Sequence, residues 1–184
     1  MKIGIFGGTF NPPHLGHLAA ARAAIGALGL DKLLIVPAAV PPHKELSEDA
    51  PAPRRRLAMA AKLADALLLP DKVEASSLEL DRTGKSYTSD TLEALRKQYP
   101  EAELWLLMGR DMFLTLDQWH HAADIVAQAG ICAFGRSGED GQAVFAPYLE
   151  FLEEAFPDAR VEIIDVPGLV DISSTRLREL LAEE

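Results

Sequence analysis

Two histidines, His14 and His17, stand three residues apart, shortly after an apolar run and the glycine pair Gly7 and Gly8. A helix that begins near them would carry both imidazoles on the same side. The start of a helix offers unpaired N–H groups and positive partial charge, and glycines let an anion approach the backbone without meeting a Cβ atom. The spacing therefore predicts a phosphate site and favours phosphoryl or nucleotidyl transfer.

Two other interpretations of the histidine pair remain open. A histidine at a helix start is often a capping or packing residue. A His-x-x-His pair also binds zinc, but zinc requires a third and usually a fourth ligand. His43 is the candidate for that place, because no Cys or acidic cluster lies nearby in the sequence. We therefore predict no resident metal.

The composition is that of a globular protein. The chain has 184 residues, 48% of them hydrophobic, which suits a single domain over residues 1–184. No apolar run reaches the length of a membrane span, and the first residues are apolar for too few positions to form a signal peptide. A single cysteine, Cys132, excludes an internal disulfide and is compatible with a reducing compartment. We expect a cytoplasmic protein in which Cys132 is buried as a small hydrophobe.

The formal net charge of −10 argues against non-specific nucleic-acid binding, which requires a basic face. An acidic protein that binds polyanions must concentrate its positive charge in one place. Arg54, Arg55 and Arg56 begin an apolar helical stretch and are predicted to form a solvated face. The remaining candidates for a cationic site are His14, His17, Lys44, Arg110, Arg136, Arg176 and Arg178.

Short apolar runs alternate with stretches of helical periodicity along the chain. Strands are predicted at residues 2–6, 33–37, 104–108, 131–134 and 161–166, with an extended segment at 73–80. Helices are predicted at residues 16–28, 53–69, 88–99, 122–129, 146–156 and 174–181. Gly29 is expected to end the first helix, and Ser or Thr to cap the third. The alternation indicates a Rossmann-like α/β fold, a parallel sheet covered by helices on both faces.

In such a fold, ligands bind outside the carboxyl ends of the strands. The histidine motif follows the first predicted strand, and Lys44 lies in the proline-rich loop 38–52 after the second. Residues 109–111 follow the 104–108 strand, and residues 172–178 follow the last strand. Long loops in compact domains are usually functional. Four separate segments are therefore predicted to meet at one edge of the sheet.

The run Gly7-Gly8-Thr9-Phe10-Asn11-Pro12-Pro13-His14-Leu15-Gly16-His17 resembles the signature of the nucleotidyltransferase superfamily that shares its histidine motif with class I aminoacyl-tRNA synthetases. Further segments resemble bacterial nicotinate-nucleotide adenylyltransferases, in that family's order and over nearly the whole chain. They are Pro41-Pro42-His43-Lys44, Gly84-Lys85-Ser86-Tyr87-Thr88, Gly109-Arg110-Asp111 with Trp119, and Ile172-Ser173-Ser174-Thr175-Arg176-Leu177-Arg178. Phosphopantetheine adenylyltransferases and cytidylyltransferases share the first motif, but Pro41-Pro42-His43-Lys44 and the segment Gly109-Arg110-Asp111 with Trp119 favour the nicotinate family. A regulatory module that only binds nucleotides would not need His14, His17, Lys44 and Arg178 together.

The resemblance implies a reaction of NAD biosynthesis. The 5′-phosphate of nicotinate mononucleotide would attack the α-phosphorus of ATP, releasing pyrophosphate and forming nicotinate adenine dinucleotide. A phosphate monoester has a second pKa near ~6 and is largely ionised at neutral pH, so no general base is needed. The site must instead align the reactants and stabilise the developing charge. Mg²⁺ is expected to arrive with ATP, held by phosphate oxygens, and a homodimer is a possible assembly.

Matched position by position, the resemblance assigns His14 and His17 to the ATP phosphates, with His17 on the α-phosphate. Lys44 would act there as a mobile point charge, and Arg178 would clamp the β- and γ-phosphates. The other residues expected around ATP are Gly7, Gly8, Thr9 and Phe10, and, around the adenine, Ile172, Ser173, Ser174 and Thr175.

For the nicotinate nucleotide, Trp119 is expected to stack on the pyridine ring, with a core tryptophan as the alternative. Asp111 would contact a ribose hydroxyl or fix the loop, and Thr88 and His120 would offer backbone N–H donors to the carboxylate. Lys44, Tyr87 and Arg136 complete this expected subsite, with a surface arginine as the alternative for Arg136. The chain departs from the family at Asn11, where Asp is common, and at Arg110, an added positive charge; the family also usually continues further beyond Arg178.

Overall fold

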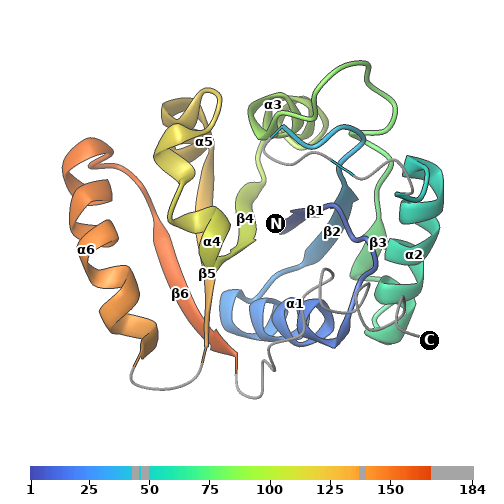
Figure 1. Cartoon of the computed structure of the whole chain (residues 1–184), viewed down its shortest axis with the longest axis horizontal. Coiled ribbons are helices and arrows are strands. Elements are labelled where there is room, and N and C mark those ends of the chain that lie inside the picture. Colours follow the sequence, from blue (N-terminus) through green and yellow to red (C-terminus); the bar gives the residue numbers. More distant parts are fainter. Residues whose placement is uncertain (43–45, 47–49, 137–139, 167–184) are drawn as a thin grey trace.

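The computed structural model describes residues 1–42, 46, 50–136 and 140–166. Within these ranges, six strands form one parallel sheet in the order β3-β2-β1-β4-β5-β6 (Figure 1). The strands are β1 (Lys2–Gly8), β2 (Lys32–Pro37), β3 (Val73–Ala75), β4 (Glu103–Gly109), β5 (Ala129–Arg136) and β6 (Val161–Val166). The order of connection reverses between β1 and β4, which is the switch point of a doubly wound sheet. The predicted Rossmann-like parallel sheet is confirmed.

Helices cover both faces of the sheet, as predicted (Figure 1). The helices on one face are α1 (Leu15–Leu28) and α2 (Pro53–Ala66), and those on the other are α3 (Thr88–Gln98), α4 (Arg110–Phe113), α5 (Ala122–Gln128) and α6 (Asp140–Ala155). Side chains alternate along each strand, so both faces bury apolar groups. In β1, Ile5 belongs to the core with α3 and α5, whereas Phe6 belongs to the core with α1 and α2. No helix within the described ranges is long and apolar enough to cross a membrane.

The starts and ends of several elements follow from local chemistry. Gly29 ends α1 in the left-handed region, with φ of 62°, as the sequence predicts. The extended segment predicted at 73–80 is a strand only over Val73–Ala75. Ser76 still donates its N–H to the Ile35 carbonyl at 2.8 Å, and the chain then turns over residues 77–81. The prediction was wrong here because an apolar pattern does not show where strand pairing stops.

Three other predictions about helices also differ from the structure. The N-cap residue of α3 is Tyr87, without a side-chain hydrogen bond, where Ser or Thr was expected. Helix α6 begins at Asp140 and continues through Pro147, whereas the sequence favoured a start beside the proline. The four-residue α4 and the 3-10 turn η1 (Leu116–Gln118) were not predicted, because elements so short show no periodicity. The helix predicted at 174–181 lies outside the described residues.

Strand β5 packs closely against its neighbours. Cys132 is fully buried there, as predicted, and burial, with a smaller contribution from Glu162, raises the pKa of its thiol to about 12. Gly130 lies beside Trp105 of β4 in the parallel register. A Cβ atom at Gly130 would lie 2.7 Å from the Trp105 ring, so the ring would have to move.

We expect Gly130→Ala to lower the free energy of unfolding by about 1–3 kcal/mol, the usual cost of overpacking a dense core. Gly26→Ala is the matched control, because Gly26 lies in α1 with open space at its Cβ position. That control should gain about 0.5–1 kcal/mol, because alanine loses less backbone entropy in a helix. Urea unfolding of both variants measures the difference. Wild-type stability of Gly130→Ala would mean that the indole ring shifts at no cost.

Candidate active site

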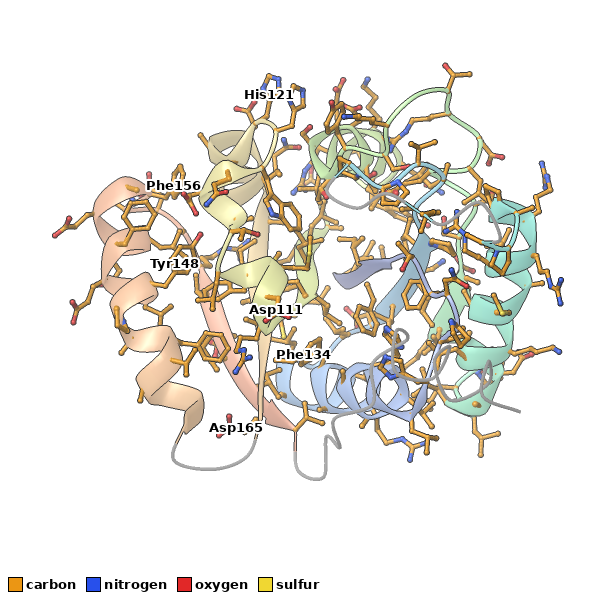
Figure 2. All side chains as sticks on the ribbon, in the orientation of Figure 1. Asp111, His121, Phe134, Tyr148, Phe156 and Asp165 are labelled. Carbon is orange, nitrogen blue, oxygen red and sulfur yellow. The ribbon has the colours of Figure 1, made fainter. Side chains whose placement is uncertain are left out.

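The carboxyl ends of β1 and β4 border a cavity of about 580 Å³. Gly7 and Gly8 line it from β1, and Gly109 lines it from β4. Asp111 of α4 and Phe134 of β5, both labelled in Figure 2, belong to the same lining. The cavity therefore lies at the switch point of the sheet, where open α/β sheets bind their ligands.

His14 and His17 meet at the start of α1, and both line the cavity. His14 is the N-cap residue and His17 the third residue of the helix, and their ring centroids are 3.8 Å apart. The backbone N–H of His14 donates to Nδ1 of His17 at 3.1 Å. Because Nδ1 accepts this hydrogen bond, a neutral His17 ring carries its proton on Nε2. His17 is thus left with an Nε2–H donor for a ligand.

The charge state of the two histidines corrects the sequence analysis, which counted both among the positive charges. Burial, and secondly the proximity of His14, lower the pKa of His17 to about 3. Burial also lowers the pKa of His14. Both imidazoles are therefore neutral at pH 7. They offer hydrogen-bond donors to an anion, and a bound anion would raise their pKa values.

The zinc interpretation of the histidine pair depends on His43, which lies outside the described residues. Among the described residues, His, Cys, Asp and Glu side chains form no group of three or more that could hold a metal ion. Nδ1 of His14 is buried, and none of the described groups forms a hydrogen bond with it.

Phe10 packs against His17 and does not line the cavity. Thr9 lines the cavity together with the two glycines, whereas Phe10 is 1% exposed and does not. Its ring lies 5.1 Å from the His17 ring and 5.7 Å from the Phe6 ring. Its φ of 47° falls in the left-handed region, which bulky side chains rarely adopt. This strained turn packs an aromatic ring against the histidine.

Thr88, Asp111 and Trp119 also line the cavity. Thr88 is the first residue of α3, and Tyr87 gives this helix start no side-chain cap, so its N–H groups can bind a ligand. The exposed Asp111 carboxylate lies 3.5 Å from the Arg110 guanidinium. Trp119 is half-buried and packs against the core with α3 and α5, so it is a core residue and a cavity residue at once.

Tyr87 and His120 do not line the cavity with their side chains. Their rings stack on each other with centroids 4.2 Å apart, and the His120 ring also meets His121 at 4.1 Å. A contact of either residue with a nicotinate nucleotide stays a prediction. For His120 that contact would come from the backbone N–H, as the resemblance implies.

Several residues that the resemblance assigns to the site lie outside the described residues. They are Lys44, Ile172, Ser173, Ser174, Thr175, Arg176 and Arg178. Of Arg136, only the backbone at the end of β5 is described. Asn11, the position that departs from the family, is buried in the turn between β1 and α1. The roles of the residues outside the described ranges stay predictions.

Sequence reasoning missed Glu79 and gave no role to Ser86, although Ser86 lies in a segment that resembles the family; both residues are buried and line the cavity. Glu79 is 8% exposed and accepts hydrogen bonds from the hydroxyls of Thr91, at 2.7 Å, and Ser86. Ser86 Oγ in turn accepts the N–H groups of Ala39 and Val40, at 2.9 and 3.3 Å. The pair therefore links the segment before α3 to the loop after β2. No signal marked Glu79, because an acidic residue in a polar segment is normally exposed.

Glu79 gives the stability a distinct pH dependence. Burial raises the pKa of its carboxyl from 4.5 to about 7. Between these values the folded protein keeps a proton that the unfolded chain has lost, so the contribution of Glu79 to stability falls as pH rises. At about 1.4 kcal/mol per pH unit, Glu79→Gln should gain up to about 3 kcal/mol relative to the wild type between pH 4.5 and 7.

Urea unfolding across that pH range measures the difference between Glu79→Gln and the wild type. Glu93→Gln is the matched control, because Glu93 is exposed and pairs with Lys97 at 2.6 Å, an arrangement that lowers its pKa. No gain with pH is expected for the control. A stability difference for Glu79→Gln that does not change with pH would show that Glu79 is ionised throughout.

The prediction of a solvated face at Arg54, Arg55 and Arg56 was wrong for Arg56. Arg54 and Arg55 are exposed, but Arg56 is fully buried, and its guanidinium donates to backbone carbonyls in three separate segments. A signal for this was available in the sequence. Arg56 shares the helical spacing i, i+4, i+7 with Ala60 and Leu63, which form the buried face of α2.

Comparisons with known proteins agree with this fold. A family model described as cytidylyltransferase-like matches residues 5–180. A nicotinate-nucleotide adenylyltransferase from Gloeobacter violaceus is 43% identical, over 98% of this chain and 84% of its own length. Its counterpart from Pelobacter propionicus is 37% identical, over 99% of this chain and 88% of its own length.

Solved structures show the same fold. Plasmodium falciparum nicotinic acid mononucleotide adenylyltransferase complexed with NaAD matches with a TM-score of 0.72 at 18% identity, covering 98% of this chain and 83% of that chain. The same enzyme complexed with APC matches with a TM-score of 0.73 at 16% identity, with the same coverage. The fold, the cavity at the switch point and the family model define a cytidylyltransferase-like nucleotidyltransferase. Within that class, the chain belongs to the nicotinate-nucleotide adenylyltransferase family.

Proposed function

We propose that this protein transfers the adenylyl group of ATP to nicotinate mononucleotide. A phosphate oxygen of the mononucleotide forms a bond to the α-phosphorus of ATP, and the bond from that phosphorus to the bridging oxygen of pyrophosphate breaks. The products are nicotinate adenine dinucleotide and pyrophosphate. The observation that carries the proposal is one cavity at the switch point that brings the His14–His17 pair together with Thr88 and Trp119. The names of relatives that match nearly the whole chain support the same reaction.

On the ATP side, the chain aligns the phosphates and stabilises charge. The neutral His17 would donate its Nε2–H to an α-phosphate oxygen, where negative charge accumulates. Gly7 and Gly8 would let the triphosphate approach the backbone at the start of α1. Lys44 and Arg178, which lie outside the described residues, would supply the permanent positive charge that the neutral histidines do not. Mg²⁺ would arrive with ATP, held by phosphate oxygens.

On the acceptor side, Trp119 would stack on the pyridine ring and Asp111 would contact a ribose hydroxyl. The first N–H groups of α3, beginning at Thr88, would receive the nicotinate carboxylate. Arg136 would contact the phosphate of the mononucleotide. Because that phosphate is already ionised at neutral pH, the reaction needs no general base.

Pyrophosphate release with different nucleotides and acceptors tests the proposal. ATP with nicotinate mononucleotide should give the highest efficiency, with nicotinate adenine dinucleotide identified as the second product. A preference for CTP or for phosphopantetheine as the acceptor would overturn the assignment. Binding of ATP without turnover of any acceptor would identify a regulatory module instead.

A further inference from the structure

Arg56 connects the segments that form the ATP side of the cavity. Its Nη1 donates to the carbonyls of Thr9, at 3.0 Å, and Ala38, at 2.6 Å. Its Nη2 donates to the Ala39 carbonyl at 3.1 Å, and its Nε donates to the Pro51 carbonyl at 3.2 Å. One guanidinium thus joins the turn after β1, the loop after β2 and the residues before α2.

The chemistry of arginine suits this arrangement. Thr9, Ala38 and Ala39 lie beyond the ends of their strands, where the ladder no longer supplies donors, and a buried carbonyl without a partner is costly. Arginine offers five N–H donors in a rigid planar fork, and Arg56 uses them for four carbonyls. A lysine ammonium is a single point and does not reach carbonyls spread over three segments.

Two of the four residues whose carbonyls Arg56 bonds belong to the cavity wall. Thr9 and Ala38 line the cavity, and the Ala38 N–H donates to the Gly8 carbonyl at 2.9 Å. Thr9 opens the turn that leads to His14 and His17, whereas Arg56 itself does not line the cavity. The guanidinium therefore lies outside the cavity and bonds the backbone of the wall that would face the ATP phosphates.

We propose that Arg56 is a positioning residue for ATP: its four hydrogen bonds fix the turn at Thr9 so that the histidine pair faces the phosphates. This proposal rests on the proposed adenylyl transfer. Arg56 donates directly to none of the residues assigned to the acceptor, Thr88, Asp111 and Trp119. Its connection to them is indirect, through Ala39, whose N–H donates to Ser86 Oγ at 2.9 Å. A defect at Arg56 should therefore act directly on ATP and only secondarily on nicotinate mononucleotide.

The test compares Arg56→Lys with Arg55→Lys, because both variants keep the charge and Arg55 is exposed on the same helix. We expect Arg56→Lys to raise the KM for ATP about tenfold and to lower kcat/KM for ATP up to about 10²-fold, since a displacement of about 1 Å has such effects. The KM for nicotinate mononucleotide should change less than about twofold, and Arg55→Lys should behave as the wild type. Assays at a temperature where circular dichroism shows a folded protein separate this effect from unfolding.

A lower unfolding temperature with unchanged KM values in Arg56→Lys would show a purely structural residue and overturn the proposal. Equal increases in both KM values would also overturn it. If Arg56→Lys does not fold, Arg56→Gln takes its place, and failure of both to fold would assign Arg56 to general stability instead. Equilibrium binding of a non-hydrolysable ATP analogue is measured in parallel. It tests Arg56 even if wild-type protein and Arg55→Lys fail to make the dinucleotide, which would contradict the proposed function alone.

Discussion

His17→Ala should lower kcat about 10²–10³-fold while leaving the protein folded, because one preorganised donor to the developing charge is removed. The size of the effect follows from the geometry. His17 lines the cavity, its Nδ1 is occupied by the His14 N–H at 3.1 Å, and its Nε2–H is left for the ligand. Single-turnover measurements with ATP and nicotinate mononucleotide give the rate of the chemical step.

Two conservative variants distinguish the acceptor role of Nδ1 from the donor role of Nε2 in His17. Asparagine places an amide oxygen close to the position of Nδ1, so His17→Asn keeps an acceptor for the His14 N–H but lacks a donor at Nε2. Glutamine places an amide N–H₂ close to the position of Nε2. We therefore expect His17→Asn to remain as impaired as His17→Ala, and His17→Gln to regain part of the rate. The opposite order would mean that the cap, and not the donor, is the function of His17.

His121→Ala is the matched control for these variants. His121 is exposed, pairs with the exposed Asp124 at 3.0 Å and contacts the His120 ring at 4.1 Å. It lies well away from the cavity residues Asp111 and Phe134 (Figure 2). An exposed pair contributes little to stability. The control should retain wild-type activity and wild-type stability. Near-wild-type turnover in folded His17→Ala would contradict the role assigned to His17.

Nicotinate mononucleotide should be used about ten- to a hundredfold more efficiently than nicotinamide mononucleotide. The two acceptors differ only in a carboxylate or an amide. The uncapped N–H groups at the start of α3 favour the carboxylate through charge-assisted hydrogen bonds. The amide would turn its own N–H₂ group towards one of these donors and leave it unpaired, at about 1–3 kcal/mol. Steady-state kinetics with both acceptors at saturating ATP measure the ratio.

Thr88→Pro tests whether the backbone N–H group of Thr88 binds the carboxylate of nicotinate mononucleotide. Proline is tolerated at the first position of a helix and lacks an N–H group, and Tyr87 already has the extended conformation that a following proline requires, with φ of −73° and ψ of 135°. In this variant the ratio of the efficiencies for nicotinate and nicotinamide mononucleotide should fall about tenfold, and helix α3 should remain folded. Thr88→Ala, which retains the N–H, should keep the preference. An unchanged ratio in Thr88→Pro would move the recognition of the carboxylate to another donor.

The framework of this protein could be predicted from local patterns. Continuous apolar runs, such as those around Ile5 and Leu106, fix buried parallel strands because both faces of each strand must be covered. The segments that follow β1 and β4 then meet at the switch point, whatever the details of packing. For this reason the placing of His14, His17 and Asp111 near one another was accessible without a structure, and Trp119 was added only by the resemblance to a known family. Lys44 and Arg178 lie outside the described residues and stay predictions.

Properties that depend on solvation were decided only by the tertiary structure. Helical spacing singles out Arg56 from Arg54 and Arg55, but only the tertiary structure shows that backbone carbonyls replace water around its guanidinium. Glu79 keeps its proton up to about pH 7, and His17 loses its charge, because segments distant in sequence exclude water from them. The sequence by itself determined the fold, the motifs and the edge of the sheet where they gather. Burial, which arises from contacts across the whole chain, determined which of these groups are charged, which donate hydrogen bonds and which hold the wall of the site in place.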